Sequence, residues 1–183
     1  DDDGAPVETV GYEISSLDGL GPAERFGRVI RFSGTCFEIF GLFRMEALRR
    51  TSLHRLYYGS DRALLAETAL LGKYAKSESA IFFNREHRAR SINIDDKRAR
   101  RQWQFNDGSN KPSFEHWALL SHLFEIAGKH KQAASPAAGL AQGAGFAARP
   151  MQLSRYGLEL VGAISPGAQR WMRRTALKVA KVS

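Results

Sequence analysis

The clearest alternation of apolar and polar positions lies between residues 57 and 72, YYGSDRALLAETALLG. Four residues recur there at the spacing of one helix face: Leu64, Leu65, Thr68 and Leu71. Ser60 is a suitable N-cap and Gly72 a suitable stop, so the pattern predicts a helix between them. Asp61 falls in the first turn of this helix, where the positive end of the helix dipole favours an ionised carboxylate.

Other segments have the patterns of further helices and of short strands. Helices are expected over Pro22–Arg31, Arg44–Arg50, Ser113–Lys129 and 150–164, with a last helix opening at Pro166. Extended structure is expected over residues 1–15, as a strand or bend over Thr35–Phe43, and as a buried strand over Ala80–Phe83. The mixture of helices and strands predicts an α/β fold.

The composition changes twice along the chain and suggests three parts. Residues 1–130 have the apolar content of a folded domain, whereas residues 131–149 are rich in Ala, Gly, Gln, Ser and Pro, as in a flexible or weakly helical linker. Residues 150–183 form a basic helical C-terminal extension. A basic amphipathic helix either docks on its own domain, which we favour, or makes peripheral contact with an anionic membrane surface.

The composition is that of a globular protein with a basic surface. The chain has 183 residues, 43% apolar and 25% charged, and a net charge of +8, although its first 24 residues contain seven acids and no Lys or Arg. Such a surface attracts phosphates of nucleotides, nucleic acids or lipids. The single cysteine, Cys36, excludes an intramolecular disulfide and is interpreted as a small buried hydrophobe. Because neither a long apolar run nor a signal peptide is recognisable, we expect a cytoplasmic location, with peripheral contact at the inner face of the membrane as the alternative.

Asp61 is the strongest candidate for chemistry. A carboxylate at a helix start is most often a cap, but an ionised one within reach of a substrate hydroxyl can also act as a general base.

Two segments around Asp61 carry a resemblance to a known family. The run FGLFRMEALRRTSL (Phe40–Leu53), followed by GSDRALLAETALLGKYAKSESAIFFNREHRARS (Gly59–Ser91), resembles the later, acceptor-side half of a bacterial family 2 glycosyltransferase domain. The shared features are a Phe-Gly-Leu segment ending in Arg, a short helix, a Gly-x-Asp helix start, a Leu/Ala-rich helix and an apolar strand leading into a basic loop with a histidine. They occur in the same order and at similar spacing, from near Arg25 to near Trp117.

The resemblance implies a fold and a reaction. The fold is an incomplete GT-A-like α/β domain that lacks its N-terminal nucleotide-binding half, followed by the helical extension. The reaction is an inverting transfer of a sugar from a nucleotide-sugar donor to a hydroxyl of a carbohydrate or lipid-linked acceptor. Asp61 is then the general base, and Gly59, Ser60 and Arg62 contact the substrate. We expect the chain alone to be inactive, as a truncated sequence or part of a longer protein.

The resemblance also implies a phosphate and metal site in the loop after the predicted strand. Arg85, Arg88 and Arg90 are the phosphate contacts, since guanidinium groups pair bidentately with phosphate oxygens. His87 is the metal ligand, and the divalent cation, Mg²⁺ or Mn²⁺, is held mostly by the missing upstream half. Asp1 and Asp3 have the literal spacing of a metal-binding Asp-x-Asp motif, but no apolar strand precedes them, so we interpret them as a solvated turn.

Two other classes of function remain open. A basic, mainly helical nucleic-acid-binding protein could use the cations of residues 95–103 with Trp103 as a stacking platform, together with the C-terminal helix. The transferase interpretation expects no nucleic-acid partner. A noncatalytic partner domain would tolerate the loss of the Asp61 carboxylate. His116, His122 and His130 lack the i, i+4 spacing of a helical zinc site and are expected to be surface or partly packed residues.

Overall fold

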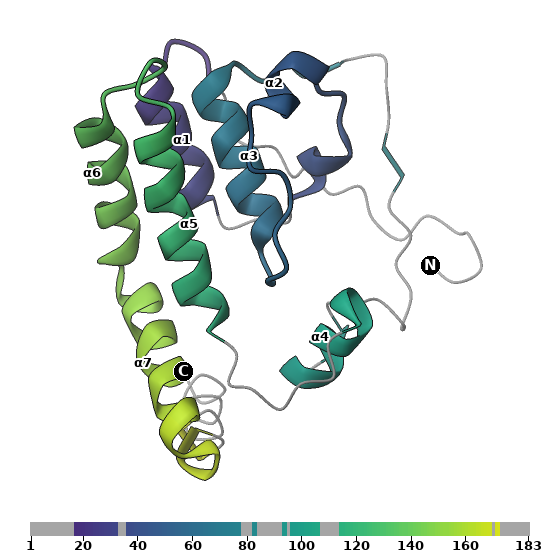
Figure 1. The fold of residues 1–183 in the computed structure, drawn as a ribbon, viewed down its shortest axis with the longest axis vertical. Coiled ribbons are helices and arrows are strands. Elements are labelled where there is room, and N and C mark those ends of the chain that lie inside the picture. The colour runs from purple at the N-terminus through teal and green to yellow at the C-terminus, as the bar shows by residue number, and fades with distance from the viewer. Residues whose placement is uncertain are drawn as a thin grey trace, which may run out of the picture.

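The computed structural model describes residues 17–32, 36–77, 82–83, 93–94, 96–106, 114–169 and 171–172. The elements in order are α1 (Pro22–Arg31), η1 (Phe37–Phe40, a 3₁₀ helix), α2 (Met45–Arg49), α3 (Ser60–Leu71), α4 (Lys97–Phe105), α5 (Glu115–Lys129), α6 (Pro136–Ala147) and α7 (Pro150–Ile164). Helices α1, α3, α5 and α6 lie side by side, and α7 continues downward from α6 beyond this group (Figure 1).

The expectation of an α/β, GT-A-like fold is wrong, because the described ranges contain only helices and irregular segments and no strand. The aromatic run at Thr35–Phe43 shows the physical reason. A strand needs a neighbouring strand to take up its backbone N–H and C=O groups. Here Ile39 N donates to Cys36 O (3.2 Å) and Gly41 N donates to Glu38 O (3.0 Å), which closes a 3₁₀ turn locally. Phe82 and Phe83 are not in a strand either, and Ala80 and Ile81 lie outside the described residues.

One apolar core holds the helices together. Its largest fully buried side chains come from α1, α3, α5 and α6 and include Phe26, Ile30, Leu65, Leu70, Leu123, Ile126 and Phe146. Arg25 of α1 is also buried and donates from Nε to the Ala69 carbonyl of α3 (2.8 Å), which satisfies both groups inside the core.

Helix α3 is the most deeply placed element and confirms the predicted helix between Ser60 and Gly72. Every residue from Ala63 to Leu70 is buried, so the helix is covered on all sides. Its N-cap differs from the expectation: Gly59 occupies that position with φ 90°, a left-handed conformation that favours glycine, and Ser60 is already in the first turn. The left-handed turn at Gly59 therefore sets where the helix begins and places Asp61 in its first turn.

The Ala/Gly-rich segment expected to act as a linker contains helix α6, which packs against α1 and α5. Two glycines permit the close approach. A Cβ at Gly139 would lie 2.9 Å from Cβ of Ala127, and one at Gly143 would lie 2.9 Å from Cε1 of Phe124. Small residues thus replace large apolar ones as the means of packing this helix.

Helix α7 supplies the cap of α5. Glu159 is buried, and its carboxylate accepts hydrogen bonds from the backbone N–H groups of His116 and Trp117 (3.1 and 3.4 Å to Oε2) and from Nδ1 of His116 (2.7 Å to Oε1). The first N–H groups of a helix have no acceptor within the helix, and here the carboxylate of Glu159, distant in sequence, is the acceptor for two of them.

Among the described helices, none is long and apolar enough to cross a membrane.

Candidate functional site

The start of α3 brings together four of the predicted site residues: Gly59, Ser60, Asp61 and Arg62. Asp61 is half-buried in the first helical turn, and its Oδ1 accepts a hydrogen bond from the backbone N–H of Arg62 (2.8 Å). Within the described part of the chain, Oδ2 of Asp61 has no hydrogen bond and the carboxylate forms no salt bridge. One carboxylate oxygen is therefore positioned by the helix and the other is uncommitted.

Asp61 lies near two half-buried proton donors, Cys36 and Tyr57. Burial raises the pKa of the Cys36 thiol to about 11, and the charge of Asp61 adds to this effect while Arg62 opposes it. Burial also raises the pKa of the Tyr57 hydroxyl, again with a contribution from Asp61. Both groups are therefore protonated at neutral pH, and neither competes with Asp61 as a base.

The hydroxyl of Ser60 contacts a neighbouring side chain within the protein. Ser60 is buried, and its Oγ lies 3.1 Å from Nδ1 of the exposed His54, which ties the preceding loop to the start of α3.

A second polar cluster surrounds Glu67, which sequence reasoning did not identify. Glu67 lies in the middle of α3 with none of its side chain exposed. Its carboxylate accepts hydrogen bonds from the backbone N–H of Ser52 (2.7 Å), from Nε2 of His130 (2.6 Å) and from Nζ of Lys129 (3.0 Å). The hydroxyl of Ser52 makes a longer contact of 3.3 Å.

These donors keep Glu67 charged inside the protein. Burial alone would raise its pKa, but the backbone N–H of Ser52 and the hydrogen bonds from His130 and Lys129 outweigh this effect, and the pKa is lowered. Each acceptor position is taken by a neighbour in the fold, so the cluster fixes the loop before α3 and the end of α5 in place. One signal in the sequence pointed to it, namely an acid within the otherwise apolar run LLAETALL.

A buried Tyr–His pair lies next to this cluster. The Tyr57 hydroxyl is 2.7 Å from Nδ1 of His122, and the two rings meet edge to face. Burial lowers the pKa of His122, so the imidazole is neutral. Its Nε2 has no hydrogen-bond partner among the described residues. His122 and His130, expected near the surface, are both buried.

The basic cluster proposed for nucleic-acid binding is partly engaged within the protein. The guanidinium of Arg100 lies 3.9 Å above the ring of Tyr58 and 3.5 Å from the carboxylate of Glu115. Trp103 is exposed, as a stacking platform requires. The engagement of Arg100 removes one of the cations that the nucleic-acid interpretation needs.

A groove of about 740 Å³ follows the contact between α1 and α6. Its lining consists of Leu20, Glu24, Arg28, Arg31, Phe32, Gln142, Gly145 and Arg149. Burial and repulsion from Arg149 and Arg28 lower the pKa of Arg31, and Arg149 also donates to the Arg31 carbonyl (3.2 Å). The three arginines could bind an anion through their guanidinium groups. All three are exposed, however, as arginines on a protein surface usually are, so their exposure does not indicate a binding site. Neither Asp61 nor Arg62 lines this groove.

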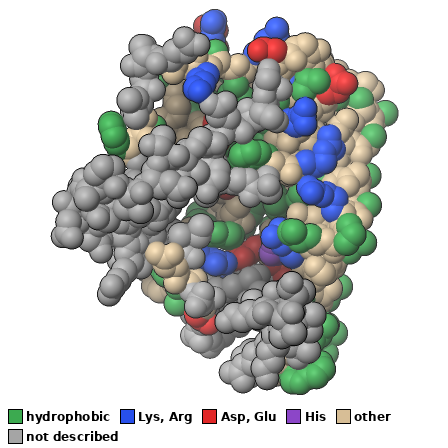
Figure 2. Space-filling model, turned by 180° about the vertical axis from the view of Figure 1, so that it is seen from behind, with side chains coloured by type: hydrophobic (Ala, Val, Ile, Leu, Met, Phe, Trp, Pro, Cys, Tyr) green, Lys and Arg blue, Asp and Glu red, His purple; other side chains and the backbone are tan. Residues whose placement is uncertain are grey.

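The face opposite to that of Figure 1 also has a hollow below its centre, where basic, acidic and histidine side chains meet (Figure 2).

The predicted loop ligands Arg85, His87, Arg88 and Arg90 lie outside the described residues, as do Asp1 and Asp3. In the part of the chain that is described, no group of three or more His, Cys, Asp or Glu residues could hold a metal ion.

Comparisons with known proteins returned no matching family model, no similar curated protein and no similar solved structure.

Proposed function

We propose that this protein takes part in an inverting transfer of a sugar from a nucleotide-sugar donor to an acceptor hydroxyl, with Asp61 as the general base. One observation carries the proposal: the Asp61 carboxylate is held by the first turn of α3 through Oδ1, while Oδ2 is uncommitted among the described residues. The resemblance of segments 40–53 and 59–91 supplies the class of reaction. The GT-A fold is not part of the proposal.

The chemistry requires little of Asp61 beyond position and charge. An acceptor hydroxyl must lie within hydrogen-bond reach, about 2.6–3.2 Å, of the free carboxylate oxygen. As the acceptor oxygen forms its bond to the anomeric carbon, its proton passes to Asp61. The bond from the anomeric carbon to the diphosphate breaks on the opposite face, and the electron pair leaves with the nucleoside diphosphate. The positive end of α3 stabilises the carboxylate before the proton arrives.

The donor and metal contacts remain separate predictions. Arg62 is adjacent to the base, whereas Arg85, Arg88, Arg90 and His87 are assigned to the donor by resemblance alone. The described residues contain no set of ligands that fits Mg²⁺ or Mn²⁺, and we assign no step to a metal ion.

The test compares wild type with Asp61→Asn in the protein made from its complete reading frame, including whatever sequence its gene encodes upstream of Asp1. Asparagine is isosteric and keeps an oxygen to accept from Arg62 N–H, but it cannot take a proton. We expect kcat to fall by about 100-fold or more, measured as nucleoside diphosphate released from a panel of nucleotide sugars with oligosaccharide or lipid-linked acceptors. Donor affinity, measured by calorimetry, should stay unchanged.

Asp96→Asn is the matched control, because Asp96 is also an acid at a helix start, where it accepts from Ala99 N–H (2.7 Å). This variant should retain wild-type turnover. Equal turnover of Asp61→Asn and wild type would overturn the proposal. Salt-sensitive binding of single-stranded nucleic acid without any sugar transfer would instead support the nucleic-acid-binding class.

A further inference from the structure

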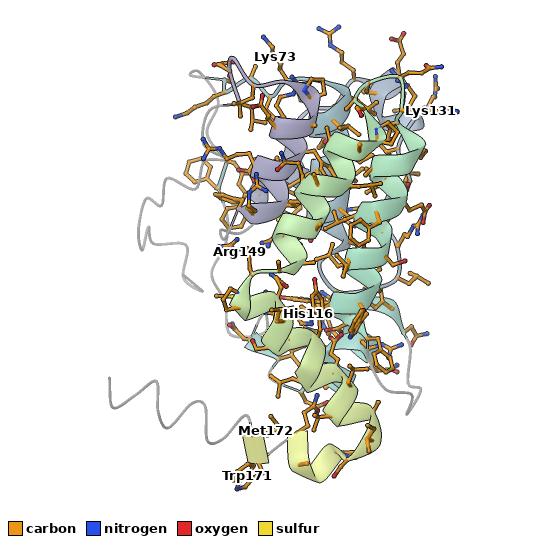
Figure 3. All side chains as sticks on the ribbon, turned by 90° about the vertical axis from the view of Figure 1, so that its left-hand side faces the viewer. Lys73, His116, Lys131, Arg149, Trp171 and Met172 are labelled. Carbon is orange, nitrogen blue, oxygen red and sulfur yellow. The ribbon has the colours of Figure 1, made fainter. Side chains whose placement is uncertain are left out.

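Helix α7 buries two polar residues and one tyrosine. These are Gln152, Glu159 and Tyr156, and the last two contact α5. Glu159 caps α5, and the ring of Tyr156 packs against that of Trp117 with centroids 4.9 Å apart. Figure 3 shows His116 at this junction of α5 and α7. The helix is therefore attached to α5 through the Glu159 carboxylate and the ring of Tyr156.

Three aliphatic residues on one side of α7 are exposed, whereas Leu158 and Val161 are half-buried. Leu153, Leu160 and Ile164 are 55%, 47% and 87% exposed. Their spacing of seven and then four residues places them on one stripe of the helix. Trp171 and Met172, also exposed, lie beyond the C-terminal end of α7, at one end of the molecule (Figure 3).

The exposed stripe of Leu153, Leu160 and Ile164 sets α7 apart from an ordinary docked helix. A surface helix normally turns its apolar stripe toward the core and its polar residues toward water. Contiguous apolar surface on a protein marks a place where something else is bound. The outer face of α7, which we define as Leu153, Leu160 and Ile164, is such a surface, and the exposed Trp171 and Met172 follow it in the chain.

The charge of this part of the chain identifies the partner. Between Pro150 and Ser183 the sequence has one acid, Glu159, which is buried. It has six bases in the same stretch: Arg155, Arg170, Arg173, Arg174, Lys178 and Lys181. Aliphatic residues and a tryptophan, accompanied by cations and by no exposed acid, match the interface of a membrane with anionic lipids. A second copy of the chain would place like charges against each other.

We propose that the outer face of α7 docks on the surface of a membrane that contains anionic lipids. The helix lies in the interfacial plane, with its aliphatic stripe and Trp171 among the acyl chains. The Arg and Lys residues that the sequence holds in this stretch pair with lipid phosphates. The proposal is independent of Asp61 and of any transferase activity.

Flotation of the full chain with lipid vesicles tests the proposal. The protein should float with vesicles of phosphatidylglycerol and phosphatidylcholine, float poorly with phosphatidylcholine alone, and be released as salt is raised. Tryptophan emission should shift to shorter wavelength on binding, and Trp171→Phe should remove most of this shift because Trp103 and Trp117 lie in other elements.

A triple variant, Leu153→Ser, Leu160→Ser and Ile164→Ser, should reduce vesicle binding at least tenfold. The matched control replaces three other exposed leucines by serine: Leu42, Leu53 and Leu56. Circular dichroism establishes that both variants fold, and the control should bind like wild type. Wild-type-like flotation of the α7 variant would overturn the proposal. So would a concentration-dependent dimer that the α7 substitutions abolish, because the occupant would then be a second copy.

Discussion

Replacing the Glu67 carboxylate by an amide should destabilise the protein strongly. Glu67 is fully buried, and its two oxygens accept from Ser52 N, His130 and Lys129. Removing one partner of a buried charged network costs about 3–5 kcal/mol, because the remaining groups stay shielded from water and lose their hydrogen-bond acceptor. Glutamine retains one carbonyl oxygen, so we expect Glu67→Gln to lower the free energy of unfolding by about 3 kcal/mol.

For a chain of this size, that loss corresponds to a fall in Tm of roughly 6–12 °C. Urea denaturation followed by circular dichroism measures the free energy directly, and an unchanged slope establishes that the same unfolding is compared. Glu125→Gln is the control. Glu125 pairs with Arg55 on the surface, where both side chains are substantially exposed, and its loss should cost less than about 1 kcal/mol. If Glu67→Gln were as mild as Glu125→Gln, the argument from burial and hydrogen bonding would be refuted.

Wild type and Glu67→Gln, compared at several pH values, also test the Glu67 network. The folded state lowers the pKa of Glu67 below its usual value of 4.5, so the stabilisation is complete above that pH and is lost as the pH falls through the folded-state value. The difference in stability between wild type and Glu67→Gln should therefore be constant near neutral pH and shrink below pH 4.5. A difference that grew on acidification would contradict the assignment.

Two other predictions concern His122 and α6. Burial lowers the pKa of His122, so this imidazole takes up a proton at a higher pH in the unfolded chain than in the folded one. The free energy of unfolding should therefore decline as the pH falls below 6.5, and it should decline less in His122→Phe. Urea titrations at pH 7.5, 6.5 and 5.5 measure both. Gly139→Ala should destabilise by about 1–3 kcal/mol because its Cβ would meet Ala127. Gly145→Ala, in the same helix with open space at its Cβ, should stabilise the protein by up to about 1 kcal/mol. Thermal unfolding of both variants should therefore show a lower Tm than wild type for Gly139→Ala and a higher one for Gly145→Ala. A stabilised Gly139→Ala would disprove the close contact.

Local patterns predicted the helices well where the sequence itself contains the start and stop signals. Pro22 and Glu24 begin α1, where Glu24 accepts from Gly21 N–H (2.8 Å), and Gly72 ends α3. These signals act within a turn or two of the chain, so a single sequence is sufficient to recognise them. The position of Asp61 in the first turn of α3 was predictable for the same reason.

Contacts between distant residues were not predictable. Glu67 and His130 are 63 residues apart, and no local pattern indicates that they meet. The same limit explains the strand prediction: β-prone residues around Ile39 form a strand only if a partner strand is available, and the described structure offers none. Helix α6 was taken for a linker because Gly139 and Gly143 look flexible until Ala127 and Phe124 are seen against them.

The cap that Glu159 provides to α5 bears on how the chain assembles during synthesis. The capping carboxylate lies 43 residues after His116. At a translation rate of about 5–20 residues per second, a ribosome adds it roughly 2–9 s after the helix that it caps. The first turn of α5 thus leaves the ribosome with open N–H groups and is completed only when the later helix folds back, so the order of maturation runs against the order of synthesis.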